Sequence, residues 1–168
     1  MEITLLPQNG LRLKGKKAPL TVDKADKTAS ALLLLQFIPD AAPIVEEMVT
    51  FNGPGEYEVG GVKISGFRSG DKTVYSMTLD GTSILVGSIQ TLTALQSKLK
   101  EHNIVIALCD GADSATFLTN LGTNVIMFYG EKAEETSQVF PKEKNQVVSK
   151  YTTSLDKLPQ EVETIVLS

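Results

Sequence analysis

Histidine and cysteine are almost absent from this chain. Its 168 residues include one histidine, His102, one cysteine, Cys109, and no tryptophan. Zinc sites draw three or four ligands from imidazole, thiolate and carboxylate groups, so this composition excludes the zinc sites that are built mainly from histidine or cysteine. A single cysteine also excludes an internal disulfide and suits a reducing compartment.

Long apolar runs are absent as well. The opening residues, Met1 to Leu6, carry no basic segment and form too short an apolar run for a signal peptide. No later stretch approaches the roughly 18 apolar residues that a membrane span needs. We therefore expect a soluble cytoplasmic protein that does not bind membranes.

An excess of positive charge is the third absence. The net charge is -4 and the isoelectric point is about 5.1, whereas phosphate binding needs clustered lysine and arginine. We therefore expect no nucleic-acid partner. The basic segment Arg12 to Lys17 is the exception, and we interpret it as a solvated hairpin edge, with a polyanion-binding patch as the alternative.

The size and composition of the chain are those of one globular domain. Hydrophobic residues make up 42% and charged residues 21%, which is too apolar for a disordered chain. A chain of about 150 residues buries roughly 68–70% of its unfolded surface, so a sizeable core is available. We expect one domain over residues 1–168.

Short alternating strands separated by turn residues occupy the first half. The segment Phe51 to Phe67, FNGPGEYEVGGVKISGF, contains a sharp bend at Gly53-Pro54-Gly55 and a two-residue hairpin loop at Gly60-Gly61. Asp80-Gly81 predicts a second loop of that type, and Asn9-Gly10 is another strong hairpin signal. The predicted hairpins join residues 2–6 to 10–14, 56–59 to 62–64, and 73–79 to 82–87.

Helical periodicity enters in the second half. Leu92, Leu95 and Leu99 recur at helical spacing and predict an amphipathic helix over residues 91–102. Further strands are predicted over 104–108, 124–129, 146–152 and 163–167, and further helices over 113–121 and 131–138. The strand-helix-strand steps imply parallel strands with right-handed crossovers. With the hairpins, they predict an α/β (α+β) fold of mixed sheets with helices packed outside.

The glycine-rich segment also carries a resemblance to a known family. Phe51 to Val59, followed by Gly61 to Gly66, and the closing Lys157 to Thr164 resemble small bacterial hydrolases of the metallo-β-lactamase fold, in the branch similar to ascorbate-phosphate lactonases. The resemblance covers nearly the whole chain. It implies a four-layer αββα sandwich of two mixed β-sheets flanked by helices. It also implies zinc-dependent hydrolysis at loops that follow the strands.

The residues that would hold zinc in that family are mostly replaced. The family carries His-x-His-x-Asp-His after a buried strand, and the matching strand here is Ala31 to Leu35. The corresponding positions are Gln36, Ile38, Asp40 and Ala41 for this motif, Ser88 for a bridging aspartate and Phe128 for a final histidine. Ile38, Ala41 and Phe128 have no lone pair to donate. We therefore expect a vestigial site with no metal and no cofactor.

Carboxylates and hydroxyls after the strands could form a different site. Asp40, Asp110 and Asp113 follow predicted strands, and Ser88 and Tyr129 would join them. Paired acids at such a place can act as general acid and base or hold Mg²⁺. The alternative is structural, with Asp40 and Asp110 in turns and Asp113 as a helix N-cap.

His102 and Cys109 are a second candidate pair for chemistry. If residues 104–108 form an extended strand, the two side chains lie roughly 20 Å apart, because a strand rises about 3.3 Å per residue. A working nucleophile and base need about 3 Å. We therefore interpret Cys109 as a small buried hydrophobe and His102 as a solvated helix end.

Two functions from different classes remain open. The first is a non-catalytic, metal-free member of the fold that acts as a binding or assembly module, with an unknown protein partner or as a homo-oligomer. The second is a hydrolase whose site was rebuilt without histidine around Asp40, Ser88, Asp110 and Asp113. An open pocket lined by these acids would favour the enzyme, and a filled one the module.

Overall fold

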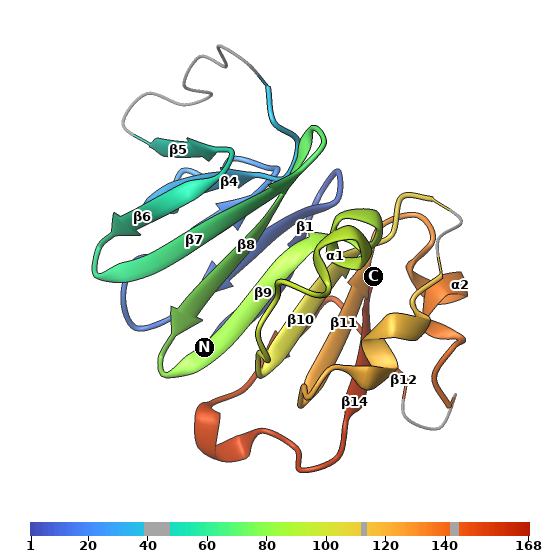
Figure 1. Cartoon of the computed structure of the whole chain (residues 1–168). Helices are drawn as coiled ribbons and strands as arrows, with labels where there is room; N and C mark the ends of the chain where they lie inside the picture. The colour runs from blue at the N-terminus through green and yellow to red at the C-terminus, as the bar shows by residue number, and fades with distance from the viewer. Residues whose placement is uncertain (39–47, 112–113, 142–144) are drawn as a thin grey trace.

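Two mixed β-sheets packed face to face make up most of the structure (Figure 1). The computed structural model describes residues 1–38, 48–111, 114–141 and 145–168. The first sheet contains six described strands in the order β13-β1-β2-β3-β4-β5. They are β1 (Glu2–Leu6), β2 (Gly10–Lys14), β3 (Leu20–Val22), β4 (Ala31–Leu34), β5 (Val49–Asn52) and β13 (Lys150–Thr152). The pairs β3-β4 and β4-β5 are parallel, and the other pairs are antiparallel.

The second sheet contains eight described strands in the order β12-β14-β11-β10-β9-β8-β7-β6. They are β6 (Gly55–Val59), β7 (Val62–Ser69), β8 (Lys72–Leu79), β9 (Thr82–Ser88), β10 (Ile104–Leu108), β11 (Val125–Tyr129), β12 (Asn145–Val148) and β14 (Glu163–Leu167). Strands β6 to β9 form antiparallel hairpins, and β9 to β14 pair in parallel. This is the mixture of hairpins and parallel steps that the sequence predicts.

Side chains of each strand alternate between two apolar layers. In β9, Ile84 and Val86 lie in the core between the sheets, whereas Leu85 lies in a second cluster beneath the helices. In β11 the same alternation puts Tyr129 between the sheets and Phe128 in the helix-side cluster. Position along a strand therefore decides which residues at the strand ends can face one another.

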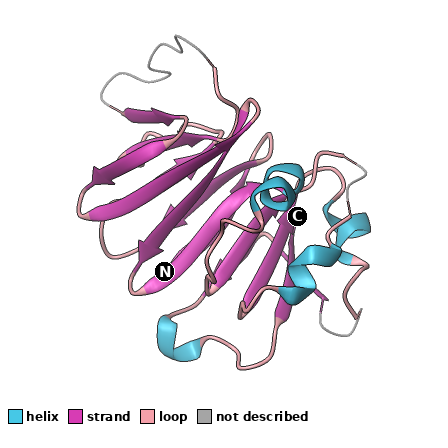
Figure 2. Ribbon diagram, in the orientation of Figure 1, coloured by secondary structure: helices cyan, strands magenta, loops and turns pink. Residues whose placement is uncertain are grey.

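Helices cover the outer face of the eight-stranded sheet (Figure 2). They are α1 (Ile89–Leu95), the 3₁₀ helix η1 (Thr116–Asn120) and α2 (Ala133–Ser137), and η3 (Leu155–Lys157) lies in the connection to β14. The helices α1, η1 and α2 are shorter than the predicted ranges 91–102, 113–121 and 131–138, and η3 lies where no helix is predicted. For α1 the reason is that Leu99 still packs against the helix-side cluster after the helix has ended, so its helical spacing in sequence reflects packing alone.

The opposite outer face has a different cover. On the outer side of the six-stranded sheet, the described residues contribute a small apolar cluster of Leu32, Leu34 and Met48, packed against Ala25 and Ala29, and no helix.

The predicted two-residue loops are present. Gly60 and Gly61 have φ values of 54° and 79°, and Asp80 and Gly81 have 52° and 84°. All four lie in the left-handed region that this loop type requires. At the first hairpin the turn is shifted by one residue, because Leu6 pairs with Gly10 and the positive φ values fall on Gln8 and Asn9.

The segment from Phe51 to Phe67 passes from one sheet to the other. At its bend, Gly53 has a φ of 114°, and a Cβ on Gly66 would lie 2.7 Å from the Gly53 carbonyl oxygen, so neither position accepts a side chain without strain. The Tyr75 hydroxyl accepts a hydrogen bond from the Gly53 N–H at 3.1 Å and lies 3.0 Å from the carbonyl oxygens of Leu34 and Phe51. One buried hydroxyl thus ties the second sheet to two strands of the first.

The final part of the chain also crosses between sheets. Residues 146–152, predicted as one strand, form β12 in the eight-stranded sheet and β13 in the six-stranded sheet, separated at Ser149. No helix in the described part of the chain has the length and apolar composition needed to cross a membrane.

Candidate functional site

Three strands of the eight-stranded sheet end in line at one edge. Leu108 at the end of β10 pairs with Ser88 of β9 on one side and with Tyr129 of β11 on the other. Asp110 lies two residues beyond Leu108, the last residue of β10. The strand ends therefore bring Ser88, Asp110 and Tyr129 to the same edge, as the sequence predicts for strands running in parallel.

A lysine stands among carboxylates at this edge. Lys72, the first residue of β8, donates a hydrogen bond to Asp110 Oδ2 at 3.0 Å. The same ammonium group lowers the pKa of Asp23, which follows β3 in the other sheet. We call Asp23, Lys72, Asp110 and Tyr129 the strand-end cluster. It joins residues from both sheets around one cation that belongs to the protein.

Asp23 has an unusual environment for a carboxylate. Its backbone has a φ of 56°, and its Oδ1 accepts a hydrogen bond from the Leu35 N–H at 2.8 Å. Protein packed around the carboxyl group raises the pKa of Asp23 to about 6, against the opposing effects of the Leu35 hydrogen bond and of Lys72. Solvent also reaches this residue, which is exposed at the surface, so water offsets part of that effect.

Tyr129 contributes a hydroxyl that is fully buried. The side chain has 0% exposure, and within the described part of the chain its hydroxyl has no hydrogen-bond partner. Burial, followed by the nearby charge of Asp23, raises the pKa of Tyr129 well above its usual value. A buried hydroxyl without a partner is uncommon in folded proteins, so Tyr129 is a notable member of this edge.

Ser88 and Phe128 have structural partners. Ser88 is the N-cap of α1, and its Oγ accepts a hydrogen bond from the Thr91 N–H at 3.3 Å and lies 2.7 Å from the Thr91 hydroxyl. Phe128 is fully buried beneath the helices, with its ring centroid 6.0 Å from that of Phe140. The structure therefore does not bring Phe128 to the strand-end cluster, since it faces the other side of the sheet.

Gln36 and Ile38 lie on the chain that leaves β4. The Gln36 amide donates a hydrogen bond to Asp71 Oδ2 at 2.7 Å. The backbone of Ile38 is held by Asn52, whose Oδ1 accepts from the Ile38 N–H and whose amide donates to the Ile38 carbonyl. The Ile38 side chain is 46% exposed. Asp40, Ala41 and Asp113 lie outside the described residues.

His102 differs from its interpretation as a solvated helix end. It lies beyond the end of α1 and is only 9% exposed. Its Nδ1 is 2.7 Å from the Lys100 carbonyl oxygen, and its Nε2 is 2.7 Å from the Ser76 hydroxyl. A carbonyl can only accept, so the Nδ1–H donates to it and Nε2 accepts from Ser76. Burial lowers the pKa of His102, which favours this neutral form. Cys109 is buried, as predicted.

The donors around this edge do not fit a zinc ion. Within residues 1–38, 48–111, 114–141 and 145–168, no three side chains of histidine, cysteine, aspartate or glutamate are grouped so that they could hold a metal. Asp23 and Asp110 are two carboxylates, but Lys72 already neutralises charge between them. A zinc site needs three or four such ligands.

Two members of the strand-end cluster escape notice in the sequence. Asp23 follows Leu20–Val22, a strand of only three residues, so the pattern of an acid directly after a buried strand is too short to stand out. Lys72 lies in a hairpin that carries no chemical motif, and Asp110 is 38 residues away from it. The pairing of β8, β9 and β10 brings Lys72 and Asp110 together, and the packing of the two sheets adds Asp23.

Comparison with known proteins shows the fold. No protein-family model and no curated protein matches this chain. Among solved structures, a protein of Thermotoga maritima that is provisionally assigned as a zinc-dependent hydrolase of the metallo-β-lactamase superfamily is similar, with a TM-score of 0.74 and 17% identity over 99% of this chain and 98% of that chain.

Two further structures are also similar. The metallo-β-lactamase fold protein YhfI of Bacillus subtilis has a TM-score of 0.60 and 8% identity, over 98% of this chain and 95% of that one. A protein of Parabacteroides distasonis, provisionally assigned as a metal-dependent hydrolase, has a TM-score of 0.60 and 11% identity, over 96% of this chain and 91% of that one. The chain therefore has the metallo-β-lactamase fold, and the predicted pair of mixed sheets is confirmed.

Proposed function

We propose that this chain is a non-catalytic, metal-free member of the metallo-β-lactamase fold that acts as a binding or assembly module. It would work with a protein partner or as a homo-oligomer. The proposal concerns what the fold does in this chain, since similarity of fold leaves function open.

The position of Lys72 is the observation that carries the proposal. Its ammonium group lies 3.0 Å from Asp110 and lowers the pKa of Asp23. The carboxylates at this edge therefore already have a cation that is part of the protein. A divalent metal would have to displace that ammonium group and would still find too few ligands among the described residues. Metal binding is therefore opposed by charge as well as by ligand number.

The remaining positions support the same conclusion. Gln36 stands at the first ligand position of the family motif, and its side-chain amide donates a hydrogen bond to Asp71. Ile38 presents an aliphatic side chain, and Phe128 fills the layer beneath the helices. Gln36 thus serves local hydrogen bonding and Phe128 serves packing, whereas the Ile38 side chain is half exposed and has no ligand atom.

An open sheet edge supports a role in assembly. Strand β12 is the last described strand of the eight-stranded sheet, and its Val147 is 60% exposed. An edge strand offers unpaired backbone groups to another chain. Association should show as an increase of average mass with concentration in sedimentation equilibrium, and Val147→Lys should reduce it. A monomer at all concentrations would remove the homo-oligomer and leave only a protein partner.

Zinc titration directly tests the proposal that the protein binds no metal. Zinc added to chelator-treated protein should give no stoichiometric heat in calorimetry and no rise in Tm. Lys72→Ala, which frees Asp110 and Asp23, should bind zinc more readily than the parent, whereas Lys132→Ala, which breaks the surface pair with Glu135, should not. One equivalent of zinc bound by the parent with a higher Tm would refute the proposal.

Tyr129 favours a second candidate function, a hydrolase with a rebuilt site near Asp40, Ser88, Asp110 and Asp113. Its buried hydroxyl has no partner in the described part of the chain and lies near Asp110, which is an arrangement that could move a proton. A screen of phosphodiesters, lactones and esters should then reveal an activity that Asp110→Asn and Tyr129→Phe each reduce. An activity that both variants retain would exclude this site.

A further inference from the structure

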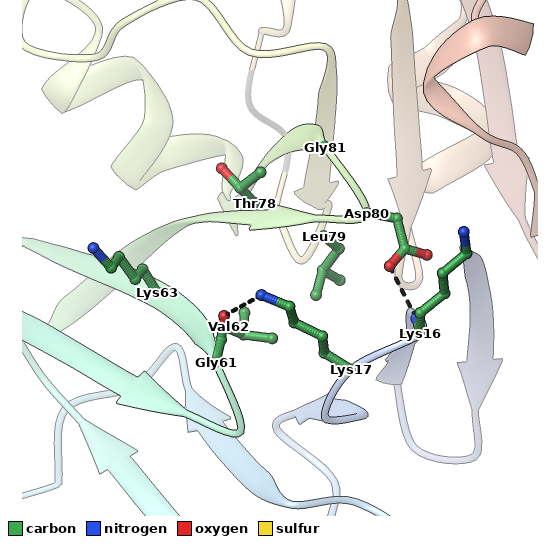
Figure 3. A pocket seen from close by; sticks show the side chains of 9 residues that line it. All are labelled: Lys16, Lys17, Gly61, Val62, Lys63, Thr78, Leu79, Asp80 and Gly81. Atoms are coloured by element: carbon green, nitrogen blue, oxygen red, sulfur yellow. Dashed lines mark hydrogen bonds between the residues drawn. The ribbon is translucent and has the colours of Figure 1, made fainter.

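A hollow lies beside the Asp80-Gly81 turn (Figure 3). It is at the opposite end of β8 from Lys72 of the strand-end cluster. It has a volume of about 490 Å³. Strand β9 runs from Thr82, beside this hollow, to Ser88 at the other end. The lining residues are Lys16, Lys17, Gly61, Val62, Lys63, Thr78, Leu79, Asp80 and Gly81. We call this the lysine hollow.

Both sheets contribute to the lysine hollow. Lys16 and Lys17 lie on the connection between β2 and β3 of the six-stranded sheet, and the other lining residues come from two hairpins of the eight-stranded sheet. Val62 and Leu79 belong to the core between the sheets and are 1% and 2% exposed. The floor of the hollow is thus the end of the apolar core.

The rim of the lysine hollow carries unbalanced positive charge. Lys16, Lys17 and Lys63 are all exposed, and Figure 3 shows Lys17 between the other two. Asp80 is the one carboxylate among the lining residues. Its Oδ2 lies 3.5 Å from the N-terminal ammonium group of Met1, and its Oδ1 accepts from the Lys16 backbone N–H at 2.9 Å. Asp80 is therefore already neutralised.

Lys17 has only a neutral partner in the hollow. Its Nζ donates a hydrogen bond to the Gly61 carbonyl oxygen at 3.0 Å (Figure 3). A carbonyl oxygen leaves the positive charge of an ammonium group uncompensated, and three rotatable donors on a flexible stem can turn to an incoming anion. Glu58 is the register partner of Lys63 in the β6-β7 pair, and its negative charge offsets part of the positive potential there. Lys17 is consequently the main anchor for an anion.

We propose that the lysine hollow binds a small amphiphilic anion, with an acidic head group on Lys17 and Lys63 and an apolar body against Leu155 and the methylene groups of the lysine side chains. Pockets of about 300–1,000 Å³ with an apolar lining and a few polar groups are typical of small-molecule sites. This site does not depend on the function proposed above, and it stands whether or not the strand-end cluster is catalytic.

The apolar rim indicates where the body of the ligand lies. Leu155 in η3 is 50% exposed, and a Cβ placed on Gly81 would lie 3.4 Å from its Cδ2. Leu155 therefore extends the apolar floor outwards from Leu79 past the Asp80-Gly81 turn. A head group alone would gain nothing from this surface, whereas an aliphatic chain would bury it.

Titration of the full-length protein with four probes tests the proposal. We expect octanoate and octyl phosphate to shift the backbone amide signals of Gly61, Lys63 and Gly81 saturably in two-dimensional NMR. The comparison of these two identifies a carboxylate or a phosphate as the preferred head. Inorganic phosphate tests the head alone, and 1-octanol tests the body alone. Saturation by either of these two as tight as by the amphiphiles would overturn the proposal, as would no saturable shift at all.

Variants separate the site from general binding. Lys17→Gln and Lys63→Gln should each weaken the amphiphilic anions about tenfold, which is about 1.4 kcal/mol. Lys27→Gln, an exposed lysine outside the hollow, should leave the affinity unchanged. All three positions are exposed, so the variants should fold, which retention of the parent amide spectrum would verify. Equal weakening in all three variants would mean that the ligand is attracted by net charge alone and would overturn the site.

Discussion

The two ends of the sandwich handle charge in opposite ways. In the strand-end cluster, Lys72 donates a hydrogen bond to Asp110 at 3.0 Å and lowers the pKa of Asp23, so the protein supplies a cation to its own carboxylates at this partly exposed edge. The lysine hollow is lined by three lysines and by Asp80, and that carboxylate is already paired with the N-terminal ammonium group. One end supplies its own counterion, and the other lacks one.

This difference determines which kind of ion each end of the fold can bind. A cation approaching the strand-end cluster must compete with Lys72, which cannot diffuse away. An anion approaching the lysine hollow competes only with the neutral Gly61 carbonyl for Lys17. The edge where the resemblance places zinc chemistry thus has carboxylate charge offset by Lys72, whereas Lys17 at the opposite end donates to a neutral carbonyl.

Loss of the Phe128 ring should destabilise the protein most. Phe128 is fully buried and packs near Phe140, so Phe128→Ala should lower the free energy of unfolding by about 3–5 kcal/mol. At the other end, Lys63→Gln should change it by less than about 0.5 kcal/mol, because Lys63 is exposed. Urea denaturation measures both. A small loss in Phe128→Ala would show that this position is not part of a packed layer.

The hydroxyl of Tyr75 should give the next largest effect. Tyr75→Phe removes an acceptor for the Gly53 N–H and a donor to the carbonyl oxygens of Leu34 and Phe51, which are buried with it. We expect a loss of about 1–3 kcal/mol in the free energy of unfolding, because a buried donor is left unpaired. Amide hydrogen exchange at Gly53 should accelerate in the variant. Unchanged exchange and unchanged stability together would contradict the role of this hydroxyl.

Local turn chemistry could be predicted from the sequence. The Gly60-Gly61 and Asp80-Gly81 loops depend on the conformation of two residues each, and both have the expected positive φ values. The pair of mixed sheets follows from hairpins and parallel steps in one chain. What these turns could not show is that Gly66 must lie against Gly53, a contact created only when the chain crosses between sheets.

Tertiary contacts account for what the sequence did not reveal. The predicted strand over residues 146–152 divides at Ser149, because its two halves join different sheets. His102 is buried through its bond to Ser76, 26 residues away, so its sequence position at the end of a helical pattern was misleading. Asp23 and Lys72 meet only after both sheets have formed. At the candidate site, the replacement of the zinc ligands stays a prediction, and the sequence does not reveal that Lys72 lies beside Asp110.

Asp23 should make stability depend on pH. Its pKa is raised to about 6 from 3.8, so its neutral form favours the folded state, and this contribution is fully present below pH 3.8 and is lost as the pH rises through 6. Asp23→Asn keeps an acceptor for the Leu35 N–H and removes the titration. Between pH 4 and pH 7 the variant should gain about 1 kcal/mol relative to the parent, because solvent at Asp23 reduces the full effect. Urea midpoints measured across this range provide the test, and parallel pH profiles of parent and variant would contradict the assignment.

The smallest predicted effect is a difference in the sign of salt dependence between the two ends. Lys72→Gln removes an attraction to Asp110, so its destabilisation, about 0.5–1 kcal/mol, should shrink as salt rises. Lys17→Gln removes a repulsion between neighbouring lysines, so the variant should be favoured most at low salt, by a few tenths of a kcal/mol. Urea midpoints at about 0.01 M and about 1 M salt, where the Debye length falls from about 30 Å to about 3 Å, measure both trends. If the two variants respond to salt with the same sign, the contrast between a satisfied end and an unbalanced end fails, because charge at both ends would then be compensated in the same way.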